Sequence, residues 1–147
     1  MKTLFDESTL QEIKDRFEKL SANATNEWGK MNAAQMLAHC TVALQVPAGD
    51  IQIKKSPLGL IGWMFKGLFR NDKPFGKNSP TAPEFVMKDN RDFEVEKQRF
   101  LEAFQKLAKG PDSVKCFHHP FFGKMTCEDW GQLMYKHMDH HFRQFGV

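Results

Sequence analysis

Two histidines near the C-terminus have the spacing of ligands that share one metal ion. His137 and His141 are four residues apart in a segment whose apolar residues recur with helical periodicity. At about 100° per residue, their side chains lie about 40° apart around a helix and one turn above the other, so both imidazoles can reach one ion. Trp130 and Met134 lie on the same side of this helix. That face is therefore expected to look into the protein core.

The third candidate ligand is His39, which lies in a different predicted helix. It is the only histidine in the first three predicted helices, and the apolar residues Met36, Cys40 and Ala43 lie beside it. Three neutral imidazoles are costly to bury without partners, because each has a donor and an acceptor to satisfy. Coordination removes this cost and keeps the imidazoles deprotonated. Three histidines also leave one coordination position for water or substrate, as in catalytic metal sites.

The same residues allow an interpretation without a metal. A single histidine on an apolar face is more often a hydrogen-bonded core residue, and histidine pairs also occur by chance on solvated helices. The spacing alone therefore leaves open whether His39, His137 and His141 are ligands or structural residues. His140 and Gln144 could support such a site, but a position at the edge of the bundle is the favoured interpretation for both.

The other residues with reactive side chains favour structural interpretations. Asp139 is expected to face solvent, because it lies far around the helix from His137. His118 and His119 could border a pocket, although a structural role in their loop is favoured. Cys127 lies near the start of the last predicted helix, where a thiol can become nucleophilic. No neighbouring base is evident in the sequence, so packing is the favoured role.

Four helices are expected to position these residues. Capping signals and apolar periodicity predict them in four stretches: after the capping box Ser8–Gln11, from Asn32 to before Pro47, from Asn90 or Asp92 to before Gly110, and from Thr126 to about Phe145. The sequence has no internal repeat and no strong run of period-two alternation. These features predict an all-α four-helix bundle that occupies residues 1–147 as one domain, with a long crossover between helices 2 and 3.

The crossover, residues 50–90, has the weakest pattern. Residues 58–65 predict a short apolar helix, and residues 71–83, which contain three prolines, predict a loop. Leu58, Ile61, Phe65 and Leu68 would form one apolar face, which could suit a membrane surface. A role in the core, as a pocket lid or in a dimer contact is favoured, because the segment lacks a strongly basic opposite face.

Composition and charge exclude several classes of protein. The net charge is +3, and the lysines are scattered rather than gathered into a stripe, so no nucleic-acid partner is expected. The longest apolar stretch, residues 57–69, is too short to span a bilayer and contains Lys66 and three glycines, so no membrane partner is expected. Three cysteines without framework spacing argue against a disulfide scaffold. The first 14 residues lack the apolar region of a secretion signal, so a cytoplasmic protein is expected.

Two stretches resemble the DinB/YfiT-like metalloprotein superfamily, and in particular a branch catalogued as a domain of unknown function. The first comprises Trp28 and residues 31–39, with the sequence MNAAQMLAH. The second spans residues 119–146 and contains HPFFGKMT, EDW, YKHMDHH and QFG. The resemblance implies a four-helix bundle with a long crossover, often a homodimer. It also implies a metal ion bound by one histidine of the second helix and two of the fourth, which by position are His39, His137 and His141.

The resemblance further implies a metal-dependent enzyme. A divalent transition-metal ion, zinc or nickel, would activate a thiol cofactor or water in a transferase- or hydrolase-like reaction on a small-molecule substrate. One alternative is a non-catalytic helical bundle with structural histidines or a structural metal, which acts as a dimeric binding module. Another is an interaction module that uses the surface of residues 58–69. Cys40 stands where an aliphatic residue is expected, which affects either the site or only its packing.

Overall fold

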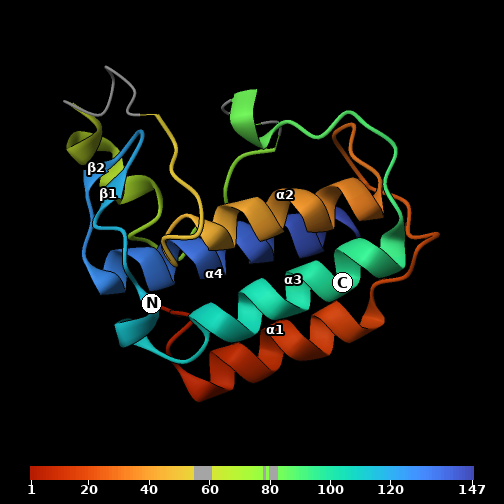
Figure 1. Ribbon diagram of the computed structural model, residues 1–147, viewed down its shortest axis with the longest axis horizontal. Helices are drawn as coiled ribbons and strands as arrows, with labels where there is room; N and C mark the ends of the chain where they lie inside the picture. The colour runs from red at the N-terminus through yellow and green to blue at the C-terminus, as the bar shows by residue number, and fades with distance from the viewer. Residues whose placement is uncertain (55–60, 78, 80–82) are drawn as a thin grey trace.

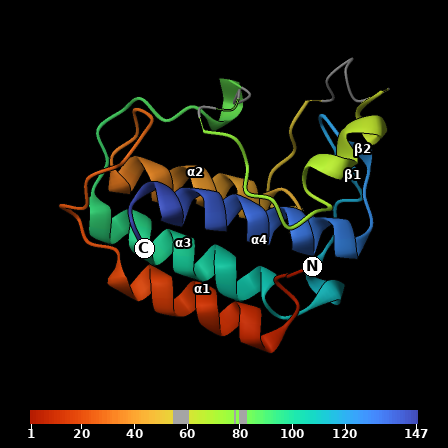
Figure 2. The ribbon, with the colours of Figure 1, turned by 180° about the vertical axis from the view of Figure 1, so that it is seen from behind.

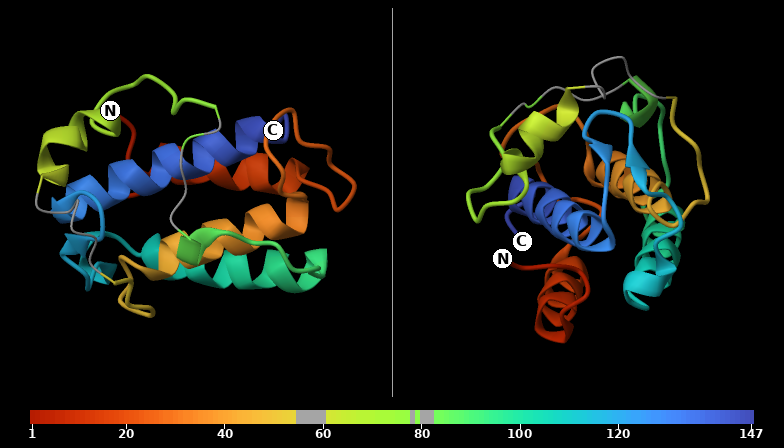
Figure 3. Two further views of the ribbon diagram at one scale, coloured as in Figure 1. Left: turned by 90° about the horizontal axis from the view of Figure 1, so that it is seen from above. Right: turned by 90° about the vertical axis from the view of Figure 1, so that its left-hand side faces the viewer.

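The computed structural model describes residues 1–54, 61–77, 79 and 83–147, and these residues contain four α-helices packed as a bundle (Figure 1). The helices are α1 (Glu7–Lys19), α2 (Ala33–Gln45), α3 (Phe93–Leu107) and α4 (Cys127–Gln144). They form two pairs, α1 with α4 and α2 with α3, and α2 also packs against α4 (Figure 3). Seen from behind, α4 lies lengthwise beside α2 (Figure 2). The predicted all-α four-helix bundle with a long crossover is confirmed.

Local capping explains where α2 and α4 begin. At α2, the Asn32 side chain accepts a hydrogen bond from the amide of Gln35, whose side chain in turn accepts one from the Asn32 amide. At α4, Thr126 and Asp129 form the same reciprocal pair. Each pair satisfies two backbone donors that the first turn of a helix leaves free. Both starts agree with the sequence prediction.

The predicted start of α1 is wrong by two residues. The helix begins at Glu7 after Asp6, whose side chain makes no capping hydrogen bond, and Ser8 lies inside the first turn. At α3, Asp92 rather than Asn90 is the cap, since its side chain accepts a hydrogen bond from the amide of Val95.

The bundle core is rich in phenylalanine. Phe17 of α1 stacks on Phe100 of α3 with ring centroids 4.9 Å apart, and Phe100 lies 6.1 Å from Phe142 of α4. Phe104 stacks on Phe100 one turn further along α3. All four side chains are buried, so this cluster joins three of the four helices. Burial of such rings is the main stabilising term for a domain of this size.

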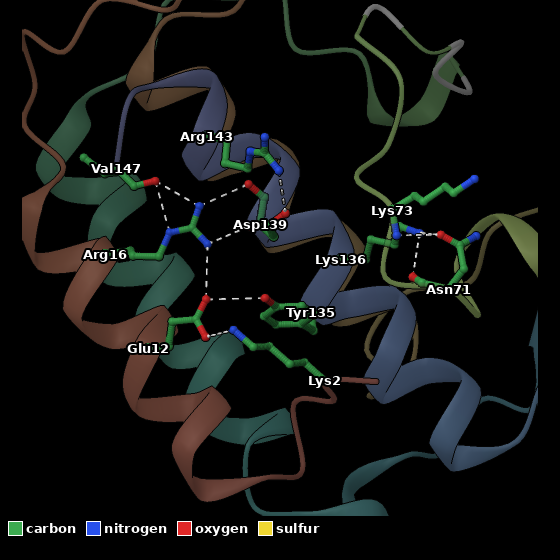
Figure 4. A network of polar contacts seen from close by, with 10 residues as sticks. All are labelled: Lys2, Glu12, Arg16, Asn71, Lys73, Tyr135, Lys136, Asp139, Arg143 and Val147. Atoms are coloured by element: carbon green, nitrogen blue, oxygen red, sulfur yellow. Dashed lines mark hydrogen bonds and ion pairs between the residues drawn. The ribbon is translucent and has the colours of Figure 1, made fainter.

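Two cationic side chains fix α4 against its neighbours, on opposite sides of the helix (Figure 4). Arg16 of α1 donates hydrogen bonds to the Asp139 carboxylate and to the carbonyl oxygen of Val147, which ties the C-terminus to the bundle. Asp139 is therefore ion-paired with Arg16. The expectation that it faces solvent is wrong. On the other side, the buried ammonium of Lys136 donates to the carbonyl oxygens of Leu68 and Asn71 in the crossover.

The described part of the crossover contains two short 3₁₀ helices, η2 (Gly62–Leu68) and η3 (Pro83–Phe85). The apolar helix expected at residues 58–65 is in part outside the described residues, and the rest falls within η2. Lys66 and Arg70 both donate to the buried carboxylate of Asp129 in α4, which fixes η2 against the bundle. Phe69, at the end of η2, is fully buried against Phe122, with ring centroids 4.9 Å apart.

Most large apolar side chains of η2 point to solvent. Trp63 is 65% exposed, and Met64, Phe65 and Leu68 are also exposed. A core role for these side chains is therefore wrong, although the segment that carries them is fixed to α4.

A hairpin with strands of two residues each, β1 (His118–His119) and β2 (Gly123–Lys124), precedes α4 and lies beside η2. No sequence pattern predicted this hairpin, because strands of two residues are too short to show alternation. None of the described helices is both long and apolar enough to cross a membrane.

Candidate metal centre

The bundle brings together the three histidines that the sequence singled out. His39 of α2 meets His137 and His141 of α4, and one ring nitrogen of each lies within 4.8 Å of the others. The ring centroids are 4.6 to 4.8 Å apart. In the part of the chain that the structure describes, this is the one cluster of histidine, cysteine or acidic side chains that could hold a metal ion.

Burial keeps the three imidazoles neutral. His39 is 4% exposed and His141 7%, and His137 is half-buried. Burial lowers the pKa of His141 to about 3, helped by the neighbouring His39. Burial also lowers the pKa of His39, and burial together with the adjacent histidines lowers that of His137. All three rings therefore have an unprotonated nitrogen at neutral pH.

The crossover determines which nitrogen of His39 is free. Its Nδ1 lies 2.8 Å from the carbonyl oxygen of Phe85 in η3. A carbonyl oxygen only accepts hydrogen bonds, so Nδ1 must carry the proton and Nε2 must be the bare nitrogen. This Nε2 lies 2.9 Å from Nε2 of His137. The crossover thus directs the lone pair of His39 toward the other two histidines.

His141 has an outer partner of its own. Its Nδ1 lies 2.9 Å from Oε1 of Gln144, one turn along α4. The amide nitrogen of Gln144 in turn donates to the carbonyl oxygen of Trp28, in the loop between α1 and α2. Gln144 is therefore a contact of the cluster, whereas the sequence favoured a position at the edge of the bundle.

The donor set fits a divalent transition-metal ion. Imidazole nitrogen is a common ligand of zinc, nickel, copper and iron, and these ions require it unprotonated. Outer hydrogen bonds from Nδ1 of His39 and His141 to oxygen acceptors are the usual support of metal-binding histidines. No fourth protein ligand joins the three imidazoles among the residues that the structure describes, which leaves room for a further ligand and suits a reactive site better than a closed structural one.

His140 lies beside the cluster rather than in it. Its ring packs 5.1 Å from that of His141, between Trp28 at 5.7 Å and Phe75 at 6.1 Å. Lys77 of the crossover packs on Trp28, with its ammonium 4.3 Å from the centroid of the Trp28 ring. Residues of the crossover and of the loop before α2 therefore surround His140, which packs on the cluster.

The remaining candidates have structural roles. Cys40 is completely buried and donates to the sulfur of Met36, and burial raises the pKa of its thiol, so its position beside His39 affects packing. His119 accepts hydrogen bonds at Nδ1 from the amides of Phe121 and Phe122, which fixes the hairpin turn.

His118 is exposed on the hairpin, away from the cluster. Cys127 lies in the first turn of α4, and the structure gives it no base partner among the described residues.

Sequence reasoning missed the outer partners of the cluster. Phe85 acts through its backbone carbonyl, so its side-chain type gives no signal. Gln144 could be noticed as a polar residue on the inner face of α4, but its partner Trp28 is 116 residues away.

One family comparison matches the chain. The sequence model of a family described as "Protein of unknown function (DUF1569)" matches residues 3–146, which is nearly the whole chain. No match was found among curated proteins or among solved structures.

Proposed function

The chain belongs to the DUF1569 family, and we propose that it is a metalloprotein whose His39, His137 and His141 hold one divalent transition-metal ion for catalysis. The observation that carries the proposal is the convergence of three buried or half-buried neutral imidazoles from two helices. The resemblance of residues 31–39 and 119–146 to the DinB/YfiT-like superfamily supports the same assignment.

An ion held by three imidazoles supplies a Lewis acid with an open position, which lowers the pKa of a water or thiol placed there. Zinc and nickel are the proposed occupants. A thiol cofactor or a small-molecule substrate is the proposed partner, in a transferase- or hydrolase-like reaction, and the resemblance favours a homodimer.

The residues of the chain prepare the site in three ways. The outer partners of His39 and His141 hold these rings so that Nε2 faces inward. The half-buried His137 ring lies 4.8 Å from that of His39 and 4.7 Å from that of His141, so the three imidazoles can share one ion. The aromatic side chains of Trp28 and Phe75, around His140, restrict water on that side.

The second candidate is a non-catalytic bundle with structural histidines, acting as a dimeric binding module. The 2.9 Å contact between Nε2 of His39 and Nε2 of His137 favours it, because the two rings satisfy each other when one nitrogen carries a proton. In that case the cluster needs no ion to offset its burial.

Elemental analysis of protein purified without a histidine tag tests the proposal. The parent is expected to contain about one equivalent of a transition metal, and His137→Ala none. His118→Ala is the matched control, since this histidine is exposed and outside the cluster, and it should keep the metal. A parent that binds neither zinc nor nickel after both are added back would overturn the metalloprotein proposal and leave the structural alternative.

The stability of the metal-free protein separates a catalytic ion from a structural one. The hydrophobic core cluster and the helix caps include none of the three candidate metal-binding histidines. Removal of the ion by a chelator should therefore leave a protein that is still folded, as measured by circular dichroism. Global unfolding on chelation would instead indicate a structural ion.

A further inference from the structure

We propose that Gln144 is a positioning residue for His141, and that the loop of residues 26–29 sets the orientation of Gln144. Gln144 holds the proton of His141 on Nδ1 and thereby turns Nε2 toward His39 and His137. The effect on metal affinity rests on the proposed function, whereas the effect on the proton of His141 does not.

The orientation of the Gln144 amide follows from its backbone partner. The carbonyl oxygen of Trp28 only accepts, so the atom of Gln144 that lies 2.5 Å from it must be the nitrogen Nε2. Oε1 then faces Nδ1 of His141 at 2.9 Å. Because Oε1 only accepts, Nδ1 of His141 must be the protonated nitrogen. A backbone carbonyl 116 residues away in the sequence thus determines the tautomer of a candidate ligand.

The loop that supplies this carbonyl is itself fixed. The side-chain amide of Asn26 donates to the carbonyl oxygens of Trp28 and Gly29, at 2.9 Å each. The amide of Glu27 donates to the carbonyl oxygen of Gln144 at 2.8 Å, so loop and helix end are joined through backbone as well. The Trp28 carbonyl is therefore held in place on both sides.

The close approach of Gly29 supports a specific fit between loop and side chain. A Cβ atom at this position would lie 2.3 Å from Nε2 of Gln144, which real contacts do not allow. Gly29 also has a φ of +82°, a backbone conformation that disfavours a side chain. The chain therefore has a glycine where the amide of Gln144 passes.

The side-chain amide of Gln144 is buried, so its hydrogen bonds matter for stability and for the orientation of His141. Gln144 is 4% exposed, and a buried amide is costly unless its groups are hydrogen-bonded. Here both ends of the amide have partners, and one of them is a candidate metal ligand. Loss of such an outer partner typically weakens metal binding roughly 10- to 100-fold.

The first test measures the tautomer of His141 in metal-free protein by nitrogen-15 NMR of the histidine side chains. The parent is expected to show His141 with the proton on Nδ1, and Gln144→Leu a mixture of the two tautomers. Gln132→Leu is the matched control, because this glutamine lies on the same helix and bonds only to the surface residue Glu128. It should leave the His141 signals unchanged.

The second test uses two glycines that both have a positive φ. Gly29→Ala and Gly110→Ala both place a side chain at positive φ, but a Cβ at Gly110 has no atom within 4 Å. Gly29→Ala should change the tautomer of His141 and lower zinc affinity roughly 10- to 100-fold in a chelator competition. Gly110→Ala should lower stability without either effect. Circular dichroism checks that each variant is folded. If Gln144→Leu does not fold, Gly29→Ala still tests the inference.

The outcomes separate this inference from the proposed function. If the parent protein does not bind zinc or nickel, the metalloprotein proposal is overturned. The NMR measurement still decides whether Gln144 sets the tautomer of His141. If the parent binds zinc and Gln144→Leu changes neither the tautomer nor the affinity, the positioning role is wrong. A changed tautomer with parental affinity would overturn the consequence for the metal and leave Gln144 as a structural partner of His141.

Discussion

Nδ1 of His39 lies 2.8 Å from the carbonyl oxygen of Phe85, so one of the three clustered histidines also attaches the crossover to α2. The side chain of His39 has partners at both ring nitrogens, Phe85 at one and His137 at the other. The crossover and the cluster should therefore respond together when His39 is changed.

The two roles of His39 can be separated by substitution. Asparagine places its amide nitrogen near the position of Nδ1, so His39→Asn should keep the bond to the Phe85 carbonyl and lose the metal. His39→Ala should lose both. Hydrogen exchange at residues 84–86 is expected to rise in His39→Ala and to stay near the parental rate in His39→Asn, with zinc affinity lost in both. Equal exchange in the two variants would contradict attachment through this bond.

The carboxylate of Asp129 should be important for stability because it joins η2 and its end to the start of α4. It accepts hydrogen bonds from the Thr126 amide, from Lys66 and from Arg70. Although burial alone would raise the pKa of Asp129, these hydrogen bonds outweigh it and lower the pKa. The group is therefore ionised throughout the neutral range.

Asp129→Asn keeps an acceptor for the helix cap but removes the charge that holds Lys66 and Arg70. The expected loss in the free energy of unfolding is about 2 kcal/mol, measured by urea denaturation. Glu128→Gln removes a charge from the same helix turn at an exposed position, and it should cost only about 0.3 kcal/mol. If the two variants are equally stable, the contact between η2 and α4 contributes nothing measurable.

Trp63 in η2 and Phe69 directly after it are a matched pair for testing which apolar residues of this segment stabilise the fold. Trp63→Ser should change the free energy of unfolding by no more than about 0.5 kcal/mol, because the ring is 65% exposed. Phe69→Ala should cost about 3 to 5 kcal/mol, because this ring is fully buried against Phe122. A large loss in Trp63→Ser would contradict the exposed position of this ring.

Local signals made most of the bundle predictable from the sequence. The reciprocal caps Asn32–Gln35 and Thr126–Asp129 use residues three positions apart, so each is visible as a short pattern. The start of α1 was misplaced because the helix begins without a side-chain cap, and the better-looking signal at Ser8 lies inside it. Patterns identify caps that exist, but they do not identify helices that begin without one.

The cluster could be predicted in part for the same reason. His137 and His141 are one helical turn apart, and His39 lies on the apolar face of its helix, so their meeting needed only the bundle. Their outer partners were beyond prediction, because Phe85 contributes a backbone carbonyl and Gln144 depends on a loop distant in sequence. The exposure of Phe65 and Leu68 was also beyond prediction, because it depends on how the crossover is held against α4.

His119 should make the stability of the metal-free protein depend on pH. Its Nδ1 accepts from the amides of Phe121 and Phe122, and an imidazolium cannot accept. Burial, with a smaller contribution from the neighbouring His118, lowers the pKa of His119 from 6.5 to about 4. As the pH falls below 6.5, the unfolded chain binds a proton at this residue before the folded protein does. The stabilisation is therefore complete above pH 6.5 and is lost progressively toward pH 4.

His119→Asn isolates this contribution, because the asparagine oxygen can accept the same amide hydrogen bonds and does not titrate. Between pH 7 and pH 4 the parent should lose on the order of 2 kcal/mol more unfolding free energy than the variant, measured by urea denaturation with a chelator present. A charged His119 also lowers the pKa of His137, as the last of its causes, so the difference is an upper limit for the contribution of His119. His118→Asn, at an exposed position, should keep most of the parental slope and lose only the smaller contribution of His118 to the pKa of His119. Parallel pH profiles for the parent and His119→Asn would show that the hairpin does not depend on a neutral His119.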